Sequence, residues 1–330
     1  MRASNTDMSL RWLIALCLTA CGVAAAAEPV GSDVPAAEPA SRVLRAGDSI
    51  LNIEVVDPPS AARREELQDW GAEAAGAALA AFGRFPLPDA TVRIEQRDSR
   101  DPSPVPWGQT LRRDGVSVLL FPRPNAGLQE LRGDWTAVHE ISHLFHPYLG
   151  GEGRWLAEGL ASYYQNVLRA RVGLMTQAQA WKALDAGFGR GRREDSGLPL
   201  EELSRRHRGT MRVYWAGAAF WLEADLALRR GGSSLDAVLS RYSRCCLRGT
   251  GESDPRAFIA ELDRVGGDGV FSRLYERYVG SREFPPLDGA YGALGIEAGP
   301  QGLKFSLQSD AMKLRHAIMA TRPARETGAP

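Results

Sequence analysis

The pattern of apolar and polar positions divides the chain into a strand-rich first part and a helix-rich second part. Alternating apolar residues from Ile50 to Val56 predict a strand, and a second strand is predicted over 90–96. Between them, an alanine-rich segment over 61–82 predicts a helix. The apolar run over 116–121, interrupted only by Ser117, is the clearest candidate for a buried strand.

From Asp134 onward nearly every periodic segment has the spacing of a helix. Helices are predicted over 135–146, 155–171, 176–187, 212–230, 234–244, 255–265 and 269–279. The segment 187–197 is polar and rich in glycine, which predicts a loop. A small mixed sheet followed by a mainly helical part corresponds to the α+β class, in which strands and helices are segregated along the chain.

The first residues, 1–27, predict an export signal. Basic residues precede an apolar run over 12–20 that is too short to anchor the chain permanently in a bilayer. Two processing sites compete: Leu18-Thr-Ala-Cys21 resembles a bacterial lipobox ending in a lipidated Cys21, whereas the alanines at 25–27 fit ordinary cleavage. Both alternatives predict an exported protein, either periplasmic or an outer-membrane lipoprotein whose membrane contact is the lipid on Cys21.

The rest of the chain is predicted to be one folded domain with flexible ends. Residues 28–46 are rich in Ala, Pro and Glu, which predicts a flexible linker. The domain is predicted to span 47–320, and the last residues, 321–330, are predicted to fray.

Charge and cysteine content exclude some classes of site. Forty basic residues balance forty acidic residues, so the formal charge of zero does not favour binding of nucleic acid. The adjacent Cys245 and Cys246 can close a ring in an oxidising compartment or remain as thiols, and the sequence leaves both alternatives open. The four cysteines do not form two spaced pairs, which excludes a zinc ribbon.

The candidate chemistry lies in the segment His139-Glu140-Ile-Ser-His143. Four residues turn a helix by about 400°, so His139 and His143 project in nearly one direction and can hold one zinc ion. Glu140 is rotated by about 100° from His139, too far to ligate easily but well placed to reach a metal-bound water. This is the physical content of the H-E-x-x-H pattern.

A catalytic zinc ion needs a third protein ligand and an open position. Glu152 lies in a glycine-rich turn, where a carboxylate is poorly fixed. Glu158 lies one turn into the next predicted helix, and a helical hairpin with a short connection brings that turn back against the first helix. Glu158 is therefore the preferred third ligand of a single zinc ion per chain, and Glu152 is the alternative.

The motifs together resemble those of gluzincin zinc metallopeptidases of the peptidase MA clan. The H-E-x-x-H segment is followed by Trp155-Leu-Ala-Glu-Gly-Leu-Ala-Ser-Tyr163, and Tyr214-Trp-Ala-Gly217 is similar to a Y-x-x-G helix of the glycyl aminopeptidase and aminopeptidase N families. The end of such domains resembles 275–295, so the likeness spans about 115–297. It implies a thermolysin-like fold with His139, His143 and Glu158 as zinc ligands. It further implies Glu140 as the catalytic base and Tyr214 as the group that stabilises the oxyanion.

Three departures from the families' pattern bear on specificity. The families usually place a longer stretch between the second histidine and the glutamate than the fourteen residues found here. A lysine of their Y-x-K-G motif is replaced by Ala216. Their G-x-M-E-N segment carries a glutamate that holds the substrate's amino terminus, and the corresponding stretch, 114–121, contains no glutamate. This last departure does not favour strict aminopeptidase activity.

Two functions from different classes follow. The first is zinc-dependent hydrolysis of peptide or protein substrates in the bacterial cell envelope, with the strand over 116–121 pairing with an extended substrate as an open sheet edge does. The second is a non-catalytic envelope module that retains the metallopeptidase fold. An intact Glu140 favours the first, because a purely structural zinc site has no use for an unligated carboxylate.

Overall fold

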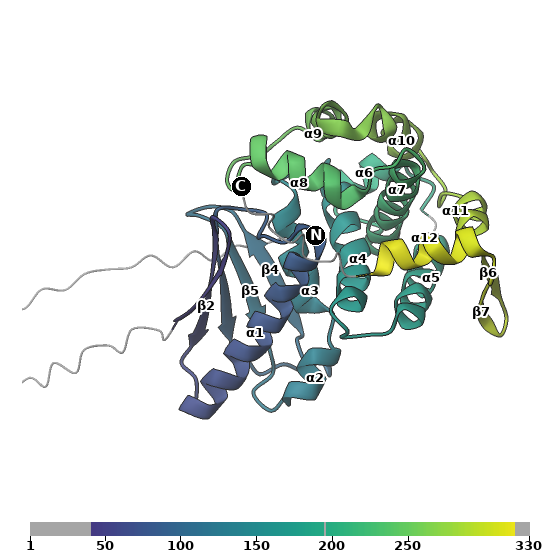
Figure 1. Ribbon diagram of the computed structural model, residues 1–330. Helices are drawn as coiled ribbons and strands as arrows, with labels where there is room; N and C mark the ends of the chain where they lie inside the picture. The colour runs from purple at the N-terminus through teal and green to yellow at the C-terminus, as the bar shows by residue number, and fades with distance from the viewer. Residues whose placement is uncertain (1–40, 195, 321–330) are drawn as a thin grey trace, which may run out of the picture. The chain divides into compact units, whose positions relative to one another are not determined.

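The computed structural model describes residues 41–194 and 196–320, and the predicted signal segment, most of the predicted linker, Cys21 and the tail 321–330 lie outside them. The described part contains a five-stranded sheet and a larger helical region (Figure 1). This arrangement confirms the predicted α+β class. None of the described helices is both long and apolar enough to cross a membrane.

The sheet has the strand order β1-β2-β3-β5-β4. Its members are β1 (Ser41–Ala46), β2 (Ser49–Val56), β3 (Asp89–Glu95), β4 (Trp107–Leu111) and β5 (Ser117–Phe121). The three inner strands are parallel, and the two outer strands, β1 and β4, pair antiparallel with their neighbours. The strand β1 occupies residues that the sequence pattern assigns to the linker, because its mostly exposed residues carry little apolar signal.

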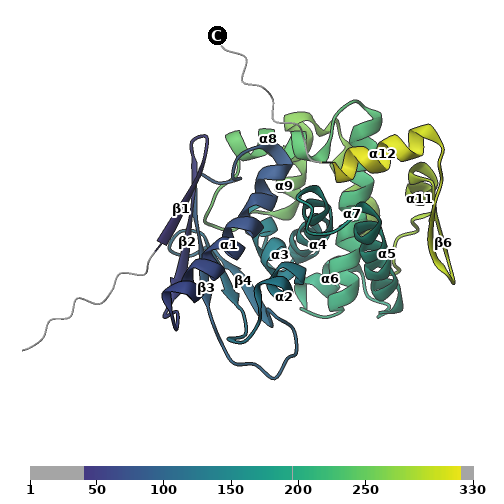
Figure 2. The same cartoon turned by 60° about the horizontal axis from the view of Figure 1, so that its bottom comes forward.

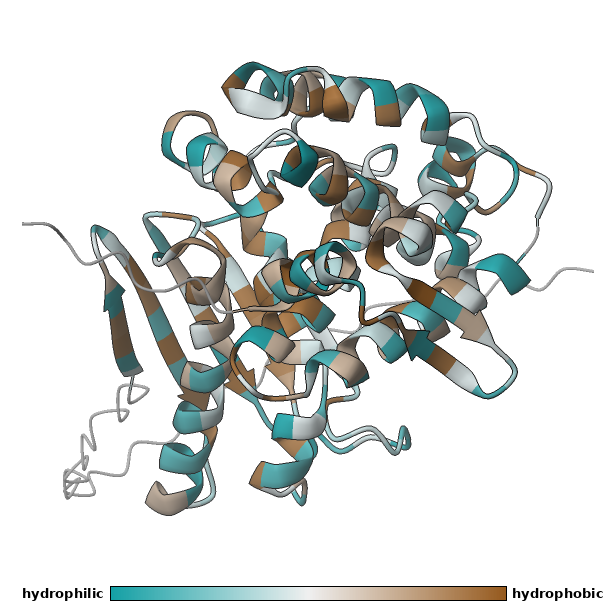
Figure 3. Ribbon diagram, turned by 45° about the vertical axis from the view of Figure 1, so that its right-hand side comes forward, coloured by the Kyte–Doolittle hydropathy of each residue, from teal (hydrophilic) through white to brown (hydrophobic). Residues whose placement is uncertain are grey.

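One face of the sheet is covered by helices. In β2 buried and half-buried positions alternate, and Leu51, Ile53 and Val55 point toward the covering helix α1 (Ala61–Phe82). Helix α3 (Thr136–Ser142) lies beside α1 and also contacts β4 and β5 (Figures 1 and 2). Figure 3 shows hydrophobic and hydrophilic residues interleaved along the strands and around the outer helices.

The helical region is built on the long helices α4 and α7, which pack against each other (Figure 1). Its longer helices are α4 (Arg154–Arg171), α5 (Gln177–Arg193), α7 (Thr210–Arg230), α8 (Leu235–Cys245), α9 (Pro255–Leu262), α10 (Val270–Val279) and α12 (Ser309–Met319). The smaller elements are α2 (Leu128–Gly133), η1 (His143–Phe145), α6 (Leu200–Arg205), η2 (Asp263–Gly267), α11 (Asp288–Leu294), β6 (Ile296–Gly299) and β7 (Gly302–Phe305).

Helix α5 continues to Arg193, so the predicted loop over 187–197 is wrong for most of its length. A side chain at Gly187 would lie within 2.4 Å of the Trp215 ring, and one at Gly191 would clash with Phe284. These glycines therefore let α5 lie close to Trp215 and to Phe284. The tertiary contacts outweigh the low helix propensity of glycine, which is the reason for predicting a loop.

Cys245 and Cys246 form a disulfide at the end of α8. Of the two alternatives that the sequence leaves open, the structure thus contains the closed ring.

Candidate active site

The three predicted metal donors converge between α3 and α4. His139 lies on α3, His143 follows its last residue at the start of η1, and Glu158 lies in the second turn of α4. The Oε2 atom of Glu158 is 3.2 Å from Nε2 of His139 and 3.6 Å from Nε2 of His143. The donor atoms of the three residues all lie within 4.8 Å of one another.

The spacing of these donors fits a tetrahedral zinc ion. Zinc bonds of roughly 2.0–2.2 Å to imidazole nitrogen and carboxylate oxygen put tetrahedral donors about 3.3 Å apart. The two nitrogen-to-oxygen distances of 3.2 and 3.6 Å lie on either side of that value. Two imidazoles and one carboxylate are also a donor set of catalytic zinc sites, which keep the fourth position for water or substrate.

The far nitrogen of each imidazole is held by a different partner. Nδ1 of His139 is 2.7 Å from Oε1 of Gln165, so the ring donates its Nδ1 proton to that amide oxygen. Nδ1 of His143 is 2.9 Å from Nε2 of His146, whose own Nδ1 lies 2.6 Å from the carbonyl oxygen of Pro147. Because both Nδ1 atoms serve as donors, both Nε2 lone pairs face the metal position.

Arg112 fixes the end of the ligand-bearing segment. Its guanidinium donates to the carbonyl oxygens of His143 and His146, at 2.6 and 2.5 Å, and to that of Gly249 at 2.8 Å. Burial lowers the pKa of Arg112 to about 10, so the group stays charged at neutral pH. These bonds satisfy carbonyls that the helix leaves without partners where it ends before Pro147.

The charges of the protein side chains favour a cation between the three donors. Burial alone raises the pKa of Glu158, but its hydrogen bond to His139 and the charges of both imidazoles lower that pKa to about 2. Burial lowers the pKa of His143 to about 4. Burial also acts to lower the pKa of His139, but the hydrogen bond to Glu158 and the charge of Glu140 outweigh it and raise that pKa. A neutral His143 and an ionised Glu158 are the states that a metal ion requires, and a bound metal ion would replace the proton that the raised pKa favours on His139.

Glu140 lies outside the donor set, between α3 and the edge strand β4. Its carboxylate accepts a hydrogen bond of 3.2 Å from the hydroxyl of Thr110, which also donates to the Glu140 carbonyl at 2.8 Å. A side chain at Gly108 would lie 2.6 Å from Cγ of Glu140, so only glycine lets the strand approach this closely. Burial raises the pKa of Glu140 to about 7, which suits a group that accepts and returns a proton near neutrality.

Tyr214 approaches the donors from α7. Its ring stacks on His139, with the ring centroids 5.9 Å apart, and its hydroxyl is hydrogen-bonded to Glu158. Two glycines make this position possible: a side chain at Gly217 would lie 2.0 Å from the Trp155 carbonyl oxygen, and one at Gly159 would lie 2.3 Å from the Gly217 backbone. The close α4–α7 contact thus places Tyr214 beside Glu158.

The structure therefore brings all five predicted site residues together: His139, Glu140, His143, Glu158 and Tyr214. The alternative ligand, Glu152, is exposed and is not part of the donor cluster. The strand predicted over 116–121 is present as β5, but its predicted pairing with a substrate is wrong, because β5 lies inside the sheet and β4 is the edge. Strand β4, Trp107–Leu111, contains no glutamate either.

Sequence reasoning missed the residues that hold the site in place. Gln165 is seven residues after Glu158, two turns along the same helix face, so helical spacing from the ligand gives the one local signal for it. Thr110, Arg112 and Gly108 reach the site through the sheet, and their sequence positions give no indication of it.

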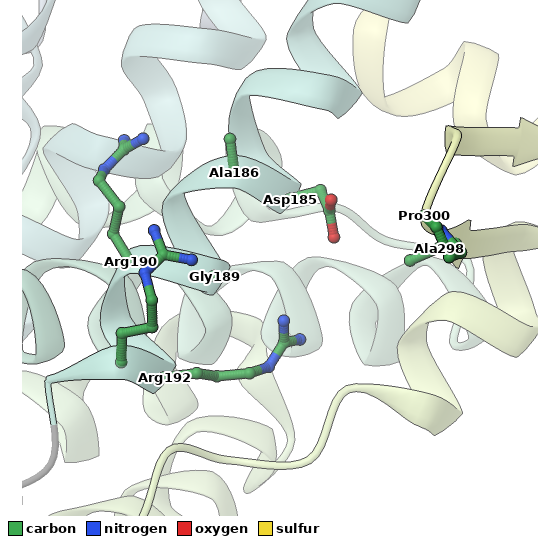
Figure 4. A pocket seen from close by; sticks show the side chains of 9 residues that line it. Asp185, Ala186, Gly189, Arg190, Arg192, Ala298 and Pro300 are labelled. Carbon is green, nitrogen blue, oxygen red and sulfur yellow. The ribbon is translucent and has the colours of Figure 1, made fainter.

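Figure 4 shows a surface pocket with several arginines in its lining. It is lined by Asp185, Ala186, Gly189, Arg190, Arg192, Arg193, Ala298, Gly299 and Pro300, from α5 and the β6–β7 hairpin. None of the five site residues lines it.

Comparisons with known proteins agree with this geometry. The model of the M61 glycyl aminopeptidase family matches residues 138–206, which include the H-E-x-x-H segment and Glu158. An aminopeptidase N family protein from Idiomarina loihiensis has a similar structure, with a TM-score of 0.57 and 15% identity over 78% of this chain and 49% of that one. The domain has the gluzincin fold.

Two further solved structures share the gluzincin fold. An M1 zinc metallopeptidase from Deinococcus radiodurans has a TM-score of 0.50 and 16% identity, covering 76% of this chain and 53% of that one. Yeast LTA4 hydrolase in complex with Bestatin has a TM-score of 0.50 and 12% identity, covering 77% of this chain and 43% of that one. The chain thus spans about half the length of the solved structures it resembles. No curated protein matches the sequence.

Proposed function

We propose that this protein is a zinc metallopeptidase that hydrolyses peptide bonds in the bacterial cell envelope. One observation carries the proposal: three donors with the spacing of a zinc site lie beside an unligated, buried carboxylate and a free sheet edge. His139, His143 and Glu158 would hold one zinc ion. A zinc ion bound there supplies a Lewis acid that polarises the scissile carbonyl and acidifies water.

Glu140 and Tyr214 carry out proton transfer and stabilisation of the oxyanion. Glu140 accepts a proton from the attacking water and passes it to the leaving amine, a role that suits its raised pKa of about 7. The hydroxyl of Tyr214 points toward the donors and donates a hydrogen bond to the oxyanion as negative charge develops on the carbonyl oxygen. Burial raises the pKa of Tyr214, so this group remains a proton donor through the physiological range.

The edge strand β4 supports binding of an extended peptide. Among the described residues it has β5 on one side and no strand on the other, so backbone groups of Trp107–Leu111 can pair with a substrate. Gly108 lies against Glu140, so a peptide paired with this strand passes beside the proposed base. Trp107 is 58% exposed and offers an apolar surface at the start of the strand.

Export is part of the proposal and has its own support and test. The closed ring of Cys245 and Cys246 suits an oxidising compartment. Fractionation of bacteria that produce the full chain should recover it in the envelope, and Cys21→Ala should move it from the membrane to the soluble periplasm if Cys21 carries a lipid. Recovery of the unprocessed chain from the cytoplasm would contradict export.

The activity is tested by metal content and peptide cleavage measured on the same preparation. The purified protein should contain about one zinc ion per chain and cleave a mixed peptide pool, and a chelator should abolish cleavage. Glu140→Gln should retain zinc and lose cleavage, whereas Glu152→Gln, a matched change of an exposed carboxylate, should retain both. A Glu140→Gln variant that binds zinc and cleaves as fast as wild type would refute the assignment.

A further inference from the structure

Arg154 is a second charged group beside the proposed active site. It is the first residue of α4 and lies one turn before Glu158, about 6 Å along the helix axis on the same face. Its guanidinium lies over the ring of Tyr214, 5.5 Å from the ring centroid. Because Tyr214 contacts both Glu158 and His139, Arg154 is separated from the metal donors by a single side chain.

This guanidinium has hydrogen-bonding capacity that the described residues do not use. Nη1 of Arg154 is buried and has no hydrogen-bond partner, and none of the described carboxylates forms an ion pair with Arg154. A guanidinium carries five N–H donors, and a buried donor without an acceptor costs free energy. By contrast, the buried guanidinium of Arg171 pairs with Asp236, and that of Arg112 donates to backbone carbonyls.

The surroundings of the site favour an anion rather than an amine at this position. The edge strand β4, Trp-Gly-Gln-Thr-Leu, has no carboxylate that could hold a substrate's amino terminus. The α4 end at which Arg154 lies is the positive end of an 18-residue helix. Both the side chain and the helix therefore attract negative charge to the side of Tyr214 that Arg154 occupies.

We propose that Arg154 binds a carboxylate of the peptide substrate, close to the scissile bond. The proposal rests on the proposed peptidase function. One residue of an extended peptide spans about 3.3–3.6 Å. The guanidinium lies 5.5 Å from the ring centroid of Tyr214, which lies 5.9 Å from that of His139, so it is at most about 11 Å from the ring of this proposed ligand. The bound carboxylate therefore lies within about three residues of the cleaved bond. That carboxylate is either the C-terminus of a short product or the side chain of Asp or Glu.

The chemistry of the pair predicts selectivity. A guanidinium binds a carboxylate through two parallel charge-assisted hydrogen bonds, which a neutral carboxamide cannot reproduce. Peptides with a free carboxylate at the matching distance should therefore be cleaved faster than the same peptides as amides.

The experiment compares matched substrates in matched variants. Peptides that wild type cleaves in a mixed pool are resynthesised with a free C-terminus, with a C-terminal amide, and as amides that carry Glu or Gln near the cleaved bond. Arg154→Met should lower kcat/KM for the matching carboxylate peptide by roughly 10- to 100-fold and leave the neutral peptide nearly unchanged. Arg154→Lys should lose less. Arg230→Met removes an exposed arginine at the other end of α7 and should change neither.

The two carboxylate sources give different outcomes. Loss confined to the free-acid peptide identifies the C-terminus, and loss confined to the Glu-containing amide identifies an acidic side chain. An equal loss of kcat/KM for carboxylate and neutral peptides would overturn the proposal, because it would mean that Arg154 acts only by positioning Tyr214. Unchanged rates for all peptides would overturn it as well.

A binding measurement keeps this inference separate from the catalytic proposal. Calorimetry on zinc-loaded Glu140→Gln should show tighter binding of the free-acid or Glu-containing peptide than of its neutral counterpart. Adding Arg154→Met should remove that difference. If wild type cleaves nothing, the peptidase assignment fails; a carboxylate preference in the binding measurement would still support the role of Arg154, and its absence would overturn that role.

Discussion

The two histidine ligands differ in what holds them. His139 is hydrogen-bonded to the side-chain amide of Gln165 on the neighbouring helix α4. His143 is hydrogen-bonded to His146, which is itself hydrogen-bonded to the carbonyl oxygen of Pro147. The hydrogen bonds that hold His143 are local, since all the residues that form them lie within five positions of one another where the helix ends. In these tautomers each partner accepts a hydrogen bond from Nδ1 of a ligand histidine. Each ligand histidine therefore keeps its Nε2 lone pair directed at the metal position.

His146→Phe should weaken zinc binding without removing a ligand. The ring of phenylalanine cannot accept the proton of His143 Nδ1, so that buried donor loses its partner and the ligand loses its orientation. Zinc affinity, measured by competition with a chelator, should fall by about 10- to 100-fold. His207→Phe alters an exposed histidine and should leave zinc affinity unchanged. If the His146→Phe variant bound zinc as tightly as wild type, the orienting role of His146 would be contradicted.

Tyr214→Phe should slow the chemical step and spare the metal. Removing the hydroxyl deletes one donor to the developing oxyanion, and such deletions cost about 10²–10³ in kcat. The phenylalanine ring still stacks on His139, so zinc content should stay near wild type. A variant with unchanged kcat would show that the hydroxyl of Tyr214 acts only as a hydrogen-bond partner of Glu158.

At the scale of elements, the contact between α4 and α7 depends on two facing glycines. Gly217→Ala should be destabilising, since the new methyl group would lie 2.0 Å from the Trp155 carbonyl oxygen and the helices would have to separate. Overpacking of this kind costs about 1–3 kcal/mol, and the shift should also lower activity by moving Tyr214.

Gly76→Ala is the matched control for the change at Gly217. Gly76 also lies inside a helix, α1, but a side chain there would meet open space. The control should therefore stabilise the protein by about 0.5–1 kcal/mol through helix propensity. Denaturant unfolding of both variants measures the contrast, and similar stabilities would contradict the close packing of α4 on α7.

The same elements show what the sequence could predict. The inner strand β5 is a run of mostly apolar residues and the helix α1 is rich in alanine, and both lie close to the bounds that the sequence predicts. The edge strand β4 was missed, because its Gly, Gln and Thr give no alternating apolar pattern. An edge strand has only one neighbour, so it needs less apolar surface, and this exposure is also what suits it to substrate binding.

The residues of the candidate site also differ in how far the local sequence predicts their positions. His139, Glu140 and His143 share one short helix, so their relative positions follow from local geometry. The position of Glu158 depends on the hairpin between α3 and α4. The order of the two helices and their short connection suggest this hairpin. Thr110 and Gly108 meet Glu140 only because the sheet folds against α3, a relation that no local pattern encodes.

At the scale of the whole domain, a zinc ion in this site would tie the sheet-covering helix α3 to the helical region. His139 and His143 come from α3 and its extension, and Glu158 comes from α4, the helix that packs on α7. The donors are placed by folding and are not assembled in the unfolded chain. Binding of zinc should therefore add to the free energy of unfolding.

Metal removal should accordingly lower the thermal stability of the domain. With zinc at about 1,000 times its dissociation constant, binding to the folded state alone contributes about 4 kcal/mol. Stripping the metal with a chelator should lower the Tm by several degrees, and restoring zinc should reverse the change. In Glu158→Gln, which weakens the site that joins α3 to α4, the shift caused by the chelator should shrink. A chelator effect of equal size in both proteins would mean that the stabilising metal binds elsewhere.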